Sequence, residues 1–149
     1  MTPEQFVAAN LQYAKNAEAE TGVPYLVALA QSALESAWGK KAPGNNLFGI
    51  RADKAWAGDK VAITTKEFIG GKMVTQTGQL FRAYPTTEGS FKDWGRFLRV
   101  NPRYKGAFLV KEDPYAFARA IAAAGYATDP QYAEKLVSMI NSVKKRVPR

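Results

Sequence analysis

The stretch from Thr21 to Gly39 carries a single charged residue, Glu35, and reads TGVPYLVALAQSALESAWG. Pro24 can occupy the first position of a helix and Gly39 can end one, so this stretch predicts a helix with Glu35 in its last turn. The apolar side of that helix should face a core and holds Leu26, Leu29, Ala30, Ala33 and Ala37. The opposite side holds Glu35 together with Ala28, Gln31 and Ser32. Because that side is lined with small residues and is uncharged apart from Glu35, another segment or an extended ligand could approach the helix closely there.

The surroundings of Glu35 suggest an acid rather than a permanent carboxylate. A carboxyl group in weakly polar surroundings is poorly solvated, which raises its pKa because desolvation disfavours the charged form. The partial negative charge at the helix C-terminus acts in the same direction. Carboxyl groups with a raised pKa serve as general acids near neutral pH. Glu35 is therefore a candidate general acid, with an ordinary surface glutamate on an amphipathic helix as the alternative.

The composition limits the chemistry that this chain can perform. Its 149 residues, 46% hydrophobic and 12% aromatic, predict one folded domain spanning residues 1–149. There is no cysteine and no histidine, which excludes disulfides, thiol nucleophiles, imidazole bases and nearly every zinc or transition-metal site. We therefore expect no metal and no cofactor. Catalysis would have to rely on carboxylates, tyrosines, lysines or hydroxyl groups.

The charge of the chain indicates the kind of partner it meets. A net charge of +8 and a pI near 9.7 favour polyanionic surroundings such as nucleic acid, an anionic membrane surface or a bacterial wall. The basic residues are scattered rather than gathered in a dense stripe, which argues against nucleic acid. No apolar run has the length of a membrane span. We expect a monomer with neither a membrane span nor a nucleic-acid partner.

Helices are predicted at both ends of the chain, with a small sheet between them. A capping box at Thr2 and Gln5 begins the first helix, which should end near Gly22. The segment 40–56, KKAPGNNLFGIRADKAW, is predicted to be an ordered loop. Later helices should begin near Glu88, Asp113 and Asp129. This order predicts an α+β fold.

The sheet is predicted within a β-lobe of approximately residues 55–85. β-branched residues dominate between Val61 and Tyr84, and Gly70–Gly71 offers a turn, so a small antiparallel hairpin is expected. The string LFRAY would close a second or third strand.

Glu67 is predicted to lie on an apolar face of this hairpin, which is an unusual place for an acidic residue. It could be an edge-strand charge that blocks aggregation, or half of an ion pair with Lys66, Lys72 or Arg82. Alternatively, it faces Glu35 across a cleft between the helical part and the hairpin. Glycoside hydrolysis uses such a pair, in which one acid protonates the leaving oxygen and one base or nucleophile acts on the opposite face of the sugar.

Five strings, in this order, resemble glycoside hydrolase family 73: ALAQSALESAWGK, NNLFGI, ITTKEFIGGK, LFRAYPT and AGYATDPQYAEKL. The likeness spans nearly the whole chain. The family comprises the N-acetylglucosaminidase modules of flagellar rod-penetrating proteins and of many wall-cleaving autolysins. The resemblance implies a lysozyme-like fold, in which a helical lobe and a small hairpin lobe form a cleft. It also implies cleavage of peptidoglycan between N-acetylglucosamine and N-acetylmuramic acid.

The resemblance further implies roles for five residues. Glu35 would be the general acid, and Glu67 matches a second, less uniformly required glutamate of the family's β-lobe. Tyr126, in the GYATDP motif, would belong to the active site, and Asn46 and Phe48 would line the saccharide groove. Glu67 would stabilise the positive charge that develops on the sugar as the glycosidic bond breaks, or would activate water. Alternatively, the 2-acetamido oxygen of the substrate could act as nucleophile, with Tyr126 orienting it.

Other functions stay open from the sequence. One is a muramidase or lytic transglycosylase of lysozyme-like fold, and another is a non-catalytic basic module that binds the wall or nucleic acid. A hydrolase of this family would act on the bacterial cell wall, in the periplasm or outside the cell. The N-terminal string MTPEQF lacks the features of a signal peptide. We therefore expect either a phage-type endolysin released by a holin or the excised catalytic part of a larger protein.

Overall fold

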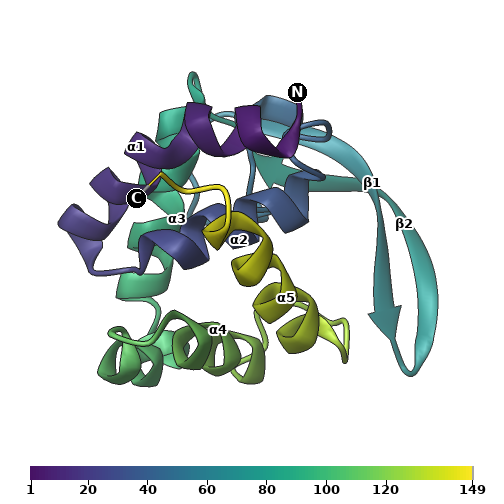
Figure 1. Ribbon diagram of the computed structural model, residues 1–149. Helices are drawn as coiled ribbons and strands as arrows, with labels where there is room; N and C mark the ends of the chain where they lie inside the picture. The colour runs from purple at the N-terminus through teal and green to yellow at the C-terminus, as the bar shows by residue number, and fades with distance from the viewer. Residues whose placement is uncertain (149) are drawn as a thin grey trace.

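The computed structural model describes residues 1–148, which form a group of helices with a two-stranded hairpin at one side (Figure 1). The α+β class expected from the sequence is confirmed. The elements in chain order are α1 (Pro3–Thr21), α2 (Tyr25–Ser36), η1 (Pro43–Asn45), β1 (Lys60–Ile69), β2 (Lys72–Arg82), α3 (Thr87–Val100), η2 (Pro102–Val110), α4 (Pro114–Ala123) and α5 (Tyr132–Lys144). None of the helices within residues 1–148 has the length and hydrophobicity that a membrane span needs.

Helix α1 begins and ends where the sequence predicts. The Thr2 hydroxyl accepts a hydrogen bond from the Gln5 N–H at 3.1 Å, and the Gln5 side chain accepts one from the Thr2 N–H at 2.8 Å. This reciprocal pair is the predicted capping box. Gly22 ends the helix in the left-handed conformation, with φ of 87°. Thr86 and Asp113 cap α3 and α4 by accepting hydrogen bonds from backbone N–H groups, so the helix starts expected there are also confirmed.

Helix α2 lies at the centre of the helical part and packs against both α1 and α5 (Figure 1). Within the helix its predicted core side is buried, except that Leu26 is only half-buried; Ala37, the last residue expected on that side, lies beyond the helix end. Ala28, Gln31 and Ser32, which were expected to line an approachable side, are fully buried as well. The prediction of an open side is therefore wrong along most of the helix, because α5 covers it. The end of the helix that carries Glu35 reaches a cavity.

The chain leaves helix α2 directly after Ser36, slightly before the predicted stop at Gly39. Ala37, Trp38 and Gly39 all adopt left-handed backbone conformations, with φ of 52°, 58° and 85°. The Ser36 hydroxyl accepts a hydrogen bond from the Gly39 N–H at 2.9 Å, which stabilises this turn. Ala37 is exposed as a result and does not face the core as expected. The early end still leaves Glu35 in the last turn, as predicted.

Strands β1 and β2 pair antiparallel through the predicted turn at Gly70–Gly71, and there is no third strand among the described residues. The strands lie inside the expected β-lobe of residues 55–85. The pairing register shifts between Ile63 and Thr65, which is a bulge in the ladder. The inward face of β1 is half-buried and carries Val61, Ile63, Thr65 and Glu67. Glu67 therefore shares an apolar face, as the sequence predicts.

Two segments differ from the expectation. Helix α5 begins at Tyr132 rather than at Asp129, because Asp129 accepts a hydrogen bond from the Gln131 N–H at 2.8 Å and closes a turn first. The 3-10 segment η2 was not predicted, because a tight helix of this kind lacks the apolar repeat of an α-helix.

Candidate active site

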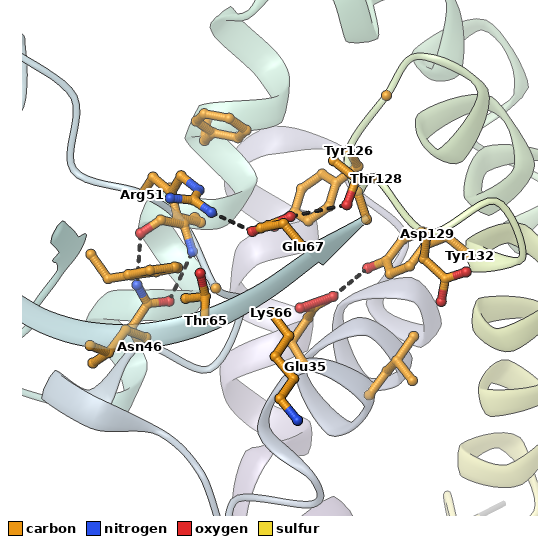
Figure 2. Close-up of a pocket in the computed structure, with 18 of the residues that line it drawn as sticks. Glu35, Asn46, Arg51, Thr65, Lys66, Glu67, Tyr126, Thr128, Asp129 and Tyr132 are labelled. Carbon is orange, nitrogen blue, oxygen red and sulfur yellow. Dashed lines mark hydrogen bonds and ion pairs between the residues drawn. The ribbon is translucent and has the colours of Figure 1, made fainter. Parts of the chain in front are cut away.

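A cleft of about 640 Å³ lies between the hairpin, the loop before it and the start of α5 (Figure 2). Glu35 enters it from the end of α2, Glu67 from β1 and Tyr126 from the turn after α4. Three residues singled out from the sequence thus line one cavity, although they come from three separate segments of the chain.

Glu35 is the most perturbed carboxyl group of the cleft. Its side chain is largely surrounded by protein atoms, and this burial raises the pKa from the ordinary 4.5 to about 7. The hydroxyl of Tyr132 donates a hydrogen bond to Glu35 Oε1 at 3.0 Å, which lowers the pKa by a smaller amount. The negative charge of Glu67 raises it further. Glu35 can therefore hold a proton near neutral pH, as the sequence predicts.

Gly49 lets the loop before the hairpin approach Glu35 closely. Its φ is 66°, a left-handed conformation that favours glycine. A Cβ at this position would lie 3.2 Å from Glu35 Oε2. Oε2 is thus adjacent to a backbone without a side chain, and both Glu35 and Gly49 line the cleft.

Glu67 is held from two sides, by Arg51 and by Thr128 (Figure 2). Its Oε1 forms an ion pair with the Arg51 guanidinium, and its Oε2 accepts a hydrogen bond from the Thr128 hydroxyl at 3.0 Å. The ion-pair partners considered from the sequence were different. Arg82, for example, pairs with Asp93 at 2.9 Å. Arg51 was missed because it lies in the irregular loop, where no periodicity indicates its direction.

Thr128 also connects the hairpin to the helical part. Its hydroxyl accepts a hydrogen bond from the Phe68 N–H at 3.1 Å while it donates to Glu67. One side chain after α4 thereby holds both the backbone of β1 and the carboxylate on it. No local pattern predicts this contact, since Phe68 and Thr128 are 60 residues apart in the sequence.

The tyrosine that touches Glu35 is Tyr132, at the start of α5, which was not among the site residues expected from the sequence. Tyr126 lines the cleft, but its hydroxyl donates to the backbone carbonyl of Phe48 at 3.0 Å. The two tyrosine rings stack, with centroids 6.1 Å apart and planes inclined by 12°. The available signal for Tyr132 was a phenol among aliphatic residues on a buried stripe, because buried phenols usually have a hydrogen-bond partner.

Asn46 lies at the cleft wall, yet its side-chain amide forms its hydrogen bonds with the protein backbone. The nitrogen donates to the carbonyls of Ile50 and Arg82, both at 2.9 Å. The oxygen accepts from the N–H groups of Phe48 and Ile50 at 3.2 and 3.3 Å. The side chain therefore ties the loop of residues 46–50 to the hairpin instead of reaching toward a sugar.

Phe48 does not line the groove as expected. It is fully buried, stacks on Trp94 with centroids 4.7 Å apart and meets Phe91 edge-on at 5.0 Å. Sequence alone could not distinguish a groove aromatic from a core aromatic in this loop. The ring fixes the loop onto α3, and Gly49 follows it directly.

The remaining polar groups of the cleft are mostly basic. Lys41, Lys66 and Arg103 line it and form no ion pair among residues 1–148, whereas Lys135 pairs with Asp129. No group of three acidic residues suited to a metal ion occurs in the described part of the chain. The lining of the cleft thus holds five basic and four acidic side chains, and the acid with the raised pKa, Glu35, suits it to acid catalysis.

Comparisons with known proteins agree with this chemistry. A family model named glucosaminidase, described as mannosyl-glycoprotein endo-beta-N-acetylglucosaminidase, matches residues 11–145. Over 149 aligned residues the chain is 42% identical to a protein named peptidoglycan hydrolase FlgJ from Vibrio parahaemolyticus, covering 96% of this chain and 48% of that protein. The chain spans about half the length of the curated relatives it matches.

Solved structures give the same picture of the fold. A peptidoglycan hydrolase mutant from Sphingomonas sp. A1 matches with a TM-score of 0.84 at 36% identity, over 96% of this chain and 97% of that chain. A truncated glycoside hydrolase domain of FlgJ from Salmonella typhimurium matches with a TM-score of 0.78 at 36% identity, over 97% of this chain and 99% of that one. The lysozyme-like α+β fold implied by the sequence is confirmed by these likenesses.

Proposed function

This chain belongs to the glucosaminidase family, and we propose that it hydrolyses peptidoglycan at the β-1,4 bond between N-acetylglucosamine and N-acetylmuramic acid. The observation that carries the proposal is the carboxyl group of Glu35, which has a pKa of about 7 and reaches a cleft large enough for sugar rings. Likeness to proteins named peptidoglycan hydrolases supports the choice of substrate. In this proposal residues 1–149 act as one catalytic unit.

Glu35 acts as the general acid. Its proton moves to the glycosidic oxygen while the bond from that oxygen to the anomeric carbon breaks, and an oxocarbenium-like centre develops on the sugar. The raised pKa supports this role, because the acid must be protonated near neutral pH and must release its proton in the transition state. After the leaving sugar departs, a water molecule supplies the new hydroxyl group and restores the proton.

Glu67 stabilises the positive centre or activates the water. The ion pair with Arg51 and the hydrogen bond from Thr128 hold its carboxylate in the cleft. The second route open from the sequence uses the 2-acetamido oxygen of the substrate as nucleophile. In that route Tyr126 orients the acetamido group.

The remaining site residues support the cleft. Tyr126 presents its ring to the cleft, and its hydroxyl would have to leave the Phe48 carbonyl to bond with substrate. Asn46 keeps the loop in place through its four hydrogen bonds. Phe48 acts only through the packing that places Gly49 beside Glu35.

The place of action in this proposal is the bacterial cell wall, reached as a monomer. The net charge of +8 supports it, since the stem peptides of peptidoglycan and the teichoic acids of many walls are anionic. Three cations of the cleft, Lys41, Lys66 and Arg103, would meet that charge close to the scissile bond. We propose two routes by which the protein reaches the wall: release as an endolysin, or delivery as part of a larger wall protein.

The identity of the cleaved bond is tested by analysing the products. Purified peptidoglycan is digested with the wild-type protein and with Glu35→Gln, reduced with borohydride and examined by mass spectrometry. The proposal predicts reduced N-acetylglucosamine ends from the wild type and none from the variant. Glu112→Gln, at a position whose side chain is 91% exposed, is the matched control and should give wild-type products.

Other products would contradict the proposal in defined ways. Reduced muramic acid ends would indicate a muramidase, and anhydro-muramic ends would indicate a lytic transglycosylase. No new ends, together with binding to the wall, would indicate a non-catalytic module.

A further inference from the structure

Three hydrogen bonds connect the core of the protein to Glu35. Trp94 Nε1 donates to Gln31 Oε1 at 2.8 Å, and Gln31 Nε2 donates to the Tyr132 hydroxyl at 2.8 Å. The Tyr132 hydroxyl then donates to Glu35 Oε1 at 3.0 Å. Trp94 and Gln31 are fully buried, and Tyr132 is 5% exposed. No step of the proposed reaction involves Trp94 or Gln31, so their role requires a separate explanation.

The donors and acceptors of Trp94, Gln31 and Tyr132 allow this chain of hydrogen bonds only one direction. An indole N–H only donates hydrogen bonds, so the carbonyl oxygen of Gln31 must face Trp94 and its NH₂ group must face Tyr132. An amide NH₂ also only donates, so the Tyr132 oxygen must accept from it. The single proton of the Tyr132 hydroxyl is then left for Glu35. Burial raises the pKa of Tyr132 well above its ordinary value, so the hydroxyl keeps that proton.

The direction of these three hydrogen bonds decides which oxygen of Glu35 can be protonated. Oε1 already accepts a hydrogen bond from the Tyr132 hydroxyl. An acidic proton on Oε1, on the side of Tyr132, would point directly at the hydroxyl proton. Tyr132 cannot turn its hydroxyl away, because the NH₂ group of Gln31 occupies the other side. Oε2 has no such obstacle, and it lies beside the bare backbone of Gly49 at the cleft.

We infer that Gln31 and Trp94 are positioning residues that act through Tyr132 to keep the acidic proton of Glu35 on Oε2, the oxygen beside Gly49. The inference rests on the proposed role of Glu35 as general acid. It explains why a glutamine, rather than an aliphatic residue, lies one helical turn before Glu35 in the buried centre of the fold. Each alternative orientation would leave a buried donor facing another donor.

The titratable groups coupled to Glu35 come from three segments, namely Tyr132 from α5, Glu67 from β1 and Tyr126 from the turn after α4. Tyr132 of α5 favours the carboxylate through its hydrogen bond, and Glu67 of β1 disfavours it through its charge. Changes at Gln31 leave the charge of Glu67 in place. An altered titration of Glu35 in a Gln31 variant therefore reports on the hydrogen-bond chain.

The test compares Gln31→Met, Tyr132→Phe and the double variant with the wild type. The pH dependence of kcat is measured on soluble glycan fragments, and the Glu35 carboxyl is titrated directly by carbon-13 NMR. Removing the Tyr132 hydroxyl should raise the Glu35 midpoint by about one pH unit, because the carboxylate loses a hydrogen bond. Gln31→Met should also raise the Glu35 midpoint. It should lower kcat about tenfold with KM unchanged, because the acidic proton of Glu35 is then free to occupy Oε1.

The double variant and a control complete the design. The double variant should titrate like Tyr132→Phe alone, because Gln31 has no other route to Glu35. Ser32→Ala is the matched control, since Ser32 is equally buried on the same helix and its hydroxyl donates only to the Leu29 carbonyl. It should leave both the midpoint and the kcat profile unchanged.

Two results would overturn the inference. One is a Glu35 midpoint unchanged in Tyr132→Phe, which differs from the wild type by one oxygen atom and provides the test even where Gln31→Met does not fold. The other is additive shifts in the double variant. Failure of the proposed function is read separately: turnover by Glu35→Gln would refute the general acid, whereas the carboxyl titration would still report on the hydrogen-bond chain.

Discussion

At the scale of single residues, Glu35 experiences opposing influences on its pKa. The surrounding protein atoms and the charge of Glu67 raise it, and the hydrogen bond from Tyr132 lowers it. Burial is the largest effect, so the neutral form persists to about pH 7. The same burial that prepares the acid therefore costs stability whenever the group is ionised.

This cost predicts a pH-dependent gain in stability for Glu35→Gln. The pKa in the folded protein, about 7, lies above the ordinary 4.5. The stability contributed by Glu35 is therefore fully present below pH 4.5 and is lost progressively as the pH rises through 7. Relative to wild type, Glu35→Gln should gain about 3 kcal/mol in free energy of unfolding between pH 4 and pH 9. Urea unfolding of both proteins across this range measures the difference.

The control for that measurement is Glu112→Gln, because the Glu112 side chain is 91% exposed. Its stability difference from wild type should stay nearly constant with pH. If the Glu35→Gln difference were equally constant, the carboxyl group of Glu35 would not be protonated at neutral pH.

Glu67 is expected to matter less than Glu35. Glu67→Gln loses the negative charge and the ion pair with Arg51, so kcat should fall by about 10-fold to 100-fold, less than for Glu35→Gln. Initial rates on soluble glycan fragments measure this order of effects. Glu134→Gln, on α5 outside the cleft, serves as the control. A rate unchanged in Glu67→Gln would restore the view of Glu67 as an edge-strand charge.

At the scale of elements, the hairpin depends on Thr128 for its connection to the loop after α4. Thr128→Val keeps the shape of the side chain but removes one acceptor for Phe68 and one donor for Glu67. We expect faster amide exchange at Phe68 and lower kcat/KM, with global stability reduced by only about 1 kcal/mol. Hydrogen exchange read by NMR measures the local effect.

Thr64→Val is the matched control, because Thr64 lies on β1 and is exposed on the face of that strand opposite Glu67. Its exchange rates and activity should equal those of the wild type. Equal exchange at Phe68 in Thr128→Val would show that the hairpin is held by other contacts.

The elements that the sequence predicts well are those determined by neighbouring residues. The capping box at Thr2, the turn at Gly70–Gly71 and the isolated charge of Glu35 are local patterns, and the structure contains each of them. Tyr132 meets Glu35 across 97 residues of chain, and no local pattern encodes that distance. The burial of Gln31 depends in the same way on α5.

The loop of residues 46–51 shows most clearly what local sequence patterns cannot predict. Its composition predicts irregular structure, yet Phe48 enters the core, Asn46 bonds to backbone and Arg51 reaches Glu67. These directions follow from tertiary packing, because an irregular loop has no period that assigns side chains to faces.

At the scale of the whole molecule, the net charge of +8 should control attachment to the wall. Binding of Glu35→Gln to purified peptidoglycan should weaken steeply between 0.05 and 1 M salt, because the screening length falls to about 3 Å at 1 M. A sedimentation assay measures the bound fraction. Chitin, a neutral glycan, is the control and should bind with little salt dependence. Binding to peptidoglycan that ignores salt would contradict a role for the charge.

The central claim is that Glu35 is the acid of the reaction, and the wild-type protein allows its most direct test. The side-chain carboxyl of Glu35 is titrated by carbon-13 NMR between about pH 5 and 9, and kcat on soluble glycan fragments is measured in the same buffers. We predict a midpoint of about 7, with kcat falling as the carboxyl ionises. A midpoint near the ordinary 4.5, or a kcat that stays constant while Glu35 loses its proton, would contradict the claim.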